Sequence, residues 1–174
     1  MPKSDGYALT LTRKILRVLM VLNPIFAFLI LVLLIASLIW ESWVMTALGV
    51  KSQVDSARLI FAMRTIMVLG IAAAPLVQVV LKRLMSIVES VDSGNPFVIL
   101  NAERLKTIAW SLVGLEVIHF VIIVVAKGAS SQELPIDVDL KFSASRWLAV
   151  LLCFVLARVF EQGAKMRDDL EGTI

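Results

Sequence analysis

The chain has 174 residues, of which 59% are hydrophobic and 18% are charged, and its net charge of +3 is spread along the sequence. So much apolar sequence excludes both a soluble globular domain and a disordered chain, and without a basic run we expect no direct contact with nucleic acid. A single cysteine, Cys153, and a single histidine, His119, exclude an intramolecular disulfide and a multi-histidine metal or haem site, so no metal or cofactor is expected.

The first element is an apolar helix that follows a basic start. Between Arg17 and Glu41 lie 23 uncharged residues, and a bilayer-spanning helix needs about 20. A secretory signal peptide has a shorter apolar region and a small-residue cleavage site, and neither is present here. The segment therefore predicts an uncleaved membrane anchor.

Three further apolar stretches follow, each with its own irregularity. The second is interrupted only by Arg64, and the third carries Glu116 and His119. The fourth has only 11 uncharged residues, from Trp147 to Ala157, so either Arg158 extends toward the headgroups or the helix begins within 142–145. The sequence predicts an all-α membrane protein, one domain over 1–174, with four transmembrane helices in an up-down bundle. The spans are expected at about 15–40, 59–81, 107–126 and 144–162.

Basic residues in the short connections predict the orientation, because they concentrate on the cytoplasmic side of a membrane protein. Eleven lie on the side of both termini: Lys3, Arg13, Lys14, Arg17, Lys82, Arg83, Arg104, Lys106, Arg158, Lys165 and Arg167. Five lie on the other side: Lys51, Arg58, Lys127, Lys141 and Arg146. Both termini are therefore expected in the cytoplasm.

The connection 82–106 is predicted to be a cytoplasmic helical corner. Helical spacing of apolar residues continues the second helix past Lys82, and Ser93-Gly94-Asn95-Pro96 then breaks it. Asn101 is expected to be the N-cap of the next helix, with Glu103 in its first turn. The tail 163–174 is expected to continue the fourth helix into the cytoplasm. Between these elements, the strict alternation in 136–142 leaves open a short extracellular strand or an extended segment on the headgroups.

Two segments carry a family resemblance, the corner GNPFVILNAERLKTIAW and the terminus FEQGAKMRDDLEGT. They resemble the bacterial membrane proteins grouped as "domain of unknown function 2975". The matching corner positions are Gly94, Pro96, Phe97, Asn101, Arg104, Leu105, Ile108 and Trp110, and the terminal ones are Phe160, Gly163, Asp169, Leu170, Glu171, Gly172 and Thr173. The resemblance implies no activity. It implies a place in the bacterial inner membrane and a helix-turn-helix regulator as a cytoplasmic partner.

Charges within spans are costly in lipid and are therefore functional candidates. Glu116 and His119 are three residues apart and share one helix face, and Arg64 is placed to reach Glu116 from the second span. One hypothesis is a proton- or ligand-responsive cluster, since histidine titrates near neutral pH. The other is a structural ion pair, which the sequence favours.

Two functions are compatible with these features. The favoured one is a non-enzymatic regulatory or scaffold membrane protein that presents the corner and the tail to a partner. The alternative is a small proton-coupled transporter that works as a dimer around Glu116. An enzyme is not expected, because the clustered carboxylates Asp168, Asp169 and Glu171 lie on an exposed tail, which makes a poor pocket.

Overall fold

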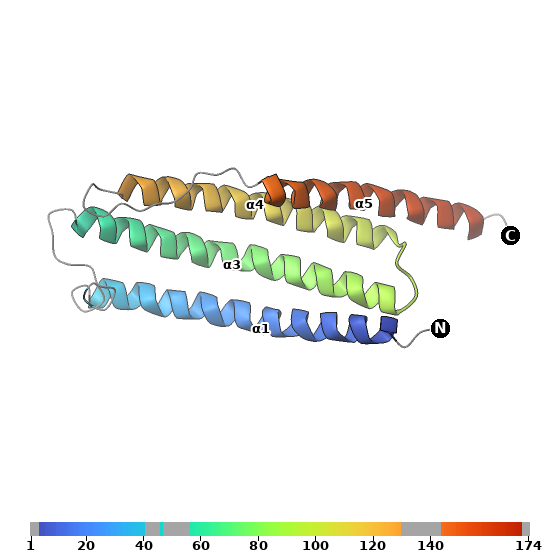
Figure 1. Ribbon diagram of the computed structural model, residues 1–174, viewed down its shortest axis with the longest axis horizontal. Coiled ribbons are helices and arrows are strands. Elements are labelled where there is room, and N and C mark those ends of the chain that lie inside the picture. The colour runs from blue at the N-terminus through green and yellow to red at the C-terminus, as the bar shows by residue number, and fades with distance from the viewer. Residues whose placement is uncertain (1–3, 41–45, 47–55, 130–143, 172–174) are drawn as a thin grey trace. The chain divides into compact units, whose positions relative to one another are not determined.

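A computed structural model describes residues 4–40, 46, 56–129 and 144–171 of the chain (Figure 1). Four long helices follow one another: α1 (Ser4–Ile39), α3 (Ser56–Asp92), α4 (Ile99–Ala129) and α5 (Ala144–Glu171). Each is long and apolar enough to cross a membrane, and the described ranges contain no strand. The prediction of an all-α protein with four helices of spanning length is therefore confirmed.

The helix ends agree with the sequence at the corner and at the tail. α3 continues to Asp92 and α4 starts at Ile99, so the break falls at the predicted Ser93–Pro96 segment. α5 starts at Ala144 and runs to Glu171, as expected for a fourth helix that begins early and continues past its apolar part. The alternating segment 136–142 lies outside the described residues.

One predicted helix start is wrong. α4 begins two residues before Asn101, so Asn101 is not its N-cap, and Glu103 lies outside the first turn. The Asn101 side chain is instead fully buried, and it forms hydrogen bonds with Ser90, Pro96 and Arg104.

The chain divides into two compact units, and each is described by itself. The first unit comprises Met1–Leu22, Leu76–Gly114 and Ser143–Ile174, and the second comprises Asn23–Pro75 and Leu115–Phe142. The corner and the tail both belong to the first unit. The intramembrane residues Arg64, Glu116 and His119 all belong to the second.

Two apolar clusters form the core of the first unit. Leu16 of α1 packs with Leu81 and Met85 of α3, and Leu105 and Ile108 of α4 pack with Ala157 of α5. Within each helix these positions are three or four residues apart, which places them on one face. Small residues allow close contact, because a Cβ at Gly114 would lie 3.1 Å from Cδ1 of Leu76.

Both prolines lie inside helices, and polar side chains bond to carbonyls near them. Pro24 has no N–H, so the Met20 carbonyl four residues earlier loses its helical donor. In the first unit, Gln78 donates its side-chain amide to that carbonyl at 3.3 Å. In the second unit, Asn23 donates to the carbonyl of Ala74, the residue before Pro75, at 2.9 Å. Such bonds make prolines tolerable within lipid.

Candidate functional site

The corner begins with a helix end that requires glycine. Gly94 has a φ of 78°, in the left-handed region that other residues disfavour. The amide of Gly94 donates to the carbonyl of Val91, and that of Asn95 donates to the carbonyl of Ser90. This pair of bonds is a Schellman motif, which satisfies the last carbonyls of α3 and turns the chain sharply.

Asn101 connects the two sides of the corner. Its side chain is fully buried, and its amide nitrogen donates to Ser90 Oγ at 2.6 Å and to the Pro96 carbonyl at 2.8 Å. Its Oδ1 accepts from Arg104 at 2.8 Å, and Arg104 also donates to the Ser86 carbonyl at 3.0 Å. The motif residues Pro96, Asn101 and Arg104 therefore act together in holding α3 and α4 in one register.

The tail packs on the corner through aromatic rings. The centroids of Phe97 and Phe160 lie 5.4 Å apart, and the Phe97 ring covers Gly163 so closely that a Cβ there would lie 2.8 Å from Cδ1 of the ring. Arg167 of the tail donates to Oδ1 of Asn95 at 3.0 Å. The two motif segments, which are about 60 residues apart in the sequence, thus form one contiguous structure.

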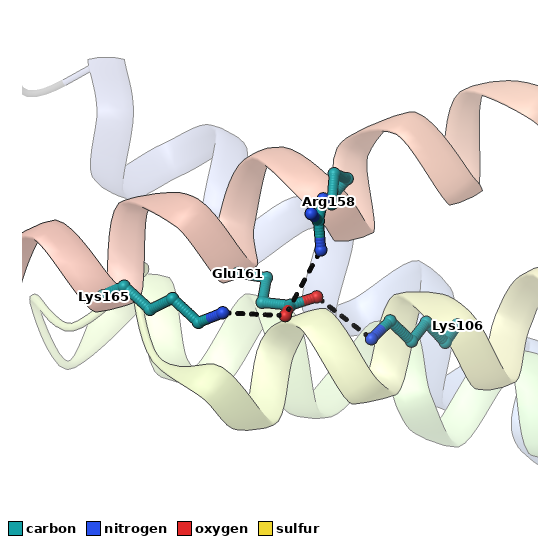
Figure 2. Close-up of polar contacts among 4 residues, drawn as sticks. All are labelled: Lys106, Arg158, Glu161 and Lys165. Atoms are coloured by element: carbon teal, nitrogen blue, oxygen red, sulfur yellow. Dashed lines mark hydrogen bonds and ion pairs between the residues drawn. The ribbon is translucent and has the colours of Figure 1, made fainter.

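A group of four charged residues joins α4 and α5 near the corner (Figure 2). Glu161 lies between three cations: its Oε2 is 3.1 Å from Lys106 Nζ, and its Oε1 is 3.3 Å from Lys165 Nζ and 3.5 Å from Arg158. We call these four residues the Glu161 cluster. The sequence indicates the Arg158–Glu161–Lys165 face, but the cation that α4 contributes is visible only in the structure.

Beyond these contacts the first unit keeps apolar side chains exposed. Ile99 and Leu100 are exposed at the start of α4, and Leu170 near the end of α5 is 73% exposed. The motif residue Asp169 is also exposed. The side chain of Glu171, and Gly172 and Thr173 entirely, lie outside the described residues.

The intramembrane residues lie in the second unit. Arg64 of α3 donates its Nε to Ser37 Oγ at 3.0 Å and a terminal nitrogen to the Ser37 carbonyl, and Ser37 is almost completely buried. The sequence did not indicate Ser37, because a serine in an apolar run has no distinguishing neighbours. Glu116 and His119 are half-buried on α4. A pairing of Arg64 with Glu116, and a proton-coupled role for Glu116, stay predictions.

The described residues of the first unit bring together charged, hydrogen-bonding and aromatic side chains. Among them, no three His, Cys, Asp or Glu side chains gather where they could hold a metal ion. The chemistry that the first unit presents is positive charge beside an aromatic surface, and exposed apolar side chains at one end.

Comparison with known proteins gives one match. Residues 15–174 match the family described as "Protein of unknown function (DUF2975)", so the match covers both motif segments. No curated protein and no solved structure matches the chain significantly.

Proposed function

Since the chain belongs to the DUF2975 family of proteins of unknown function, we propose that it is a non-enzymatic membrane protein that docks a cytoplasmic partner on its corner and tail. The partner that we propose is a DNA-binding regulator of helix-turn-helix type. The four helices would form an up-down bundle in the bacterial inner membrane, with both termini in the cytoplasm. The excess of basic residues on the side of the termini supports this orientation.

One observation carries the proposal. The family motif residues Phe97, Asn101, Phe160 and Gly163 have internal partners, but Leu170 is 73% exposed at the end of a helix that continues beyond its apolar stretch. Together with Met166, which is 61% exposed on the same helix end, Leu170 supports an interaction surface, because several exposed apolar side chains are informative where a single one is not. The contacts between corner and tail hold exposed Ile99 and Leu100 on the same unit.

Site-specific photocrosslinking in cells tests this proposal. A photoreactive residue at Leu100 or at Leu170 should capture a protein that mass spectrometry identifies as a DNA-binding regulator. The matched control is Leu151, which is 59% exposed on α5, between Leu100 at 54% and Leu170 at 73%. It lies in the apolar stretch and should capture none. Recovery of only the protein's own helices at all three positions would contradict partner docking.

The orientation has its own test. A tag placed after Ile174 should be inaccessible to protease outside intact cells and accessible in inverted vesicles. Cleavage in intact cells would overturn the layout, and the partner surface would then lie on the wrong side.

A further inference from the structure

The Glu161 cluster lies where two helices change from apolar to charged sequence. Lys106 directly precedes the uncharged stretch of α4 that begins at Thr107, and Arg158 directly follows the uncharged stretch of α5 that ends at Ala157. Because a charged side chain is costly within hydrocarbon, these positions mark the boundary between the acyl chains and the headgroups. Both boundaries meet at one place, since Lys106 contacts Glu161 at 3.1 Å.

An aromatic pair lies one turn closer to the hydrocarbon. Trp110 is four residues from Lys106, Phe154 is four residues from Arg158, and their rings meet edge to face with centroids 5.7 Å apart. Trp110 is 67% exposed. Tryptophan is enriched at the level of lipid headgroups, because its ring is apolar and its N–H is polar. The Trp110–Phe154 pair thus lies next to the Glu161 cluster, on the side of the apolar stretches.

The cluster contains more positive charge than it neutralises internally. Glu161 has a side-chain exposure of 17%, whereas Arg158 and Lys165 are 68% and 65% exposed. One carboxylate among three cations leaves a net charge of +2. Glu103 on α4 lies four residues from Thr107, closer to the apolar stretches than Lys165, which lies eight residues past Ala157. Counting Glu103 with the cluster leaves a net charge of +1, so the cations still exceed the carboxylates at this level.

We propose that the Glu161 cluster binds the phosphate of an acidic phospholipid in the leaflet on the corner side. Arg158 offers several N–H donors in a fork that matches a phosphate, and Lys106 and Lys165 act as point charges. The carboxylate of Glu161 pairs with these cations and opposes the phosphate, and the Trp110–Phe154 pair contacts the upper acyl chains. Basic pockets between transmembrane helices on the cytoplasmic side are known to take anionic headgroups.

The test compares lipid retention by purified variants. Protein in neutral detergent is mixed with phosphatidylglycerol or phosphatidylcholine, and native mass spectrometry counts the bound lipid. Arg158→Gln or Lys165→Gln should each weaken phosphatidylglycerol binding about fivefold, the effect of one cation near an anionic headgroup. Glu161→Gln should strengthen it about fivefold for the same reason. Phosphatidylcholine should show neither change.

The matched control is Arg83→Gln. Within the first unit, the contacts Ser86–Arg104 and Leu76–Gly114 fix the antiparallel register of α3 and α4, which sets Arg83 at the level of Thr107. Arg83 is exposed and lies outside the cluster, so its substitution should leave retention unchanged.

Three outcomes would overturn the proposal. Equal loss in Arg83→Gln would mean unspecific attraction to a basic surface. Loss in Glu161→Gln as well as in the cation variants would mean that the cluster is only a structural ion pair. Displacement of the lipid by inorganic phosphate at matched concentration would mean a site for free anions.

Discussion

The substitution Gly163→Ala tests how the tail is held on the corner. An added Cβ would lie 2.8 Å from Cδ1 and 3.3 Å from Cε1 of Phe97, which is too close for carbon atoms. Overpacking a well-filled contact costs about 1–3 kcal/mol, whereas alanine in place of a helical glycine contributes about 1 kcal/mol. We expect the free energy of unfolding to fall by up to about 2 kcal/mol.

Two other helical glycines provide matched controls, because an added Cβ at each would lie further from its nearest neighbouring atom than at Gly163. The nearest side-chain atom is at 3.1 Å for Gly114 and at 3.9 Å for Gly70, where ordinary van der Waals contact results. Gly70→Ala should therefore keep the helical gain of up to about 1 kcal/mol. Gly114→Ala should lie between Gly70→Ala and Gly163→Ala in stability.

Unfolding in mixed micelles with rising dodecyl sulfate, followed by circular dichroism, measures the series. Adding Phe97→Leu to Gly163→Ala should recover part of the loss, because the smaller side chain leaves room for the methyl group. If Gly163→Ala proves as stable as Gly70→Ala, the Phe97 ring does not hold the tail as described, and the contact between the motif segments loses its support.

The same unfolding assay checks three further predictions. Asn101→Leu should lower the free energy of unfolding by roughly 2–4 kcal/mol, because three hydrogen bonds are lost in a buried position, and an unchanged midpoint would refute the network. Gly94→Ala should cost about 1–2 kcal/mol through its positive φ, and Gly94→Asn less, because asparagine tolerates that conformation; equal costs would point to some other cause. Gln78→Leu should cost about 1 kcal/mol in the natural chain and less in Pro24→Ala, where the Met20 carbonyl regains its backbone donor. Equal costs in both backgrounds would show that Gln78 does not replace the missing bond.

The helices and the corner follow from local sequence properties. One uncharged run of spanning length and three apolar stretches with charged interruptions or short cores predicted the four helices, and the Ser93–Pro96 segment predicted the break between α3 and α4. These features depend on residues adjacent in the chain, so no knowledge of packing is required. The salt bridge of Glu161 with Lys165 was likewise predictable, since both lie on one helix face four residues apart.

The role of Asn101 depends on the packing of one helix against another. As a local signal, asparagine after a proline-containing turn favours an N-cap. The structure instead buries its amide between Ser90 and Pro96, because α4 starts earlier and packs against α3 in a register that the sequence does not specify. The contact of Lys106 with Glu161 was missed for the same reason, since it joins residues 55 positions apart.

Some motif residues have contacts within the fold and others are exposed. We expect the first group to contribute to stability and the second to contact a partner. Gly94 supports a left-handed turn, Asn101 bonds three groups, and Gly163 makes room for the Phe97 ring, so the fold alone accounts for them. Leu170 has no such reason, because its side chain is 73% exposed on a charged helix end. Leu170→Ala should therefore leave the unfolding midpoint unchanged and abolish crosslinking from Leu100. Gly163→Ala should lower the unfolding midpoint. It should weaken crosslinking from Leu100 only by the fraction of protein that is unfolded. A variant at Leu170 that unfolds as readily as Gly163→Ala would assign the exposed leucine to the fold and remove the argument for a docked partner.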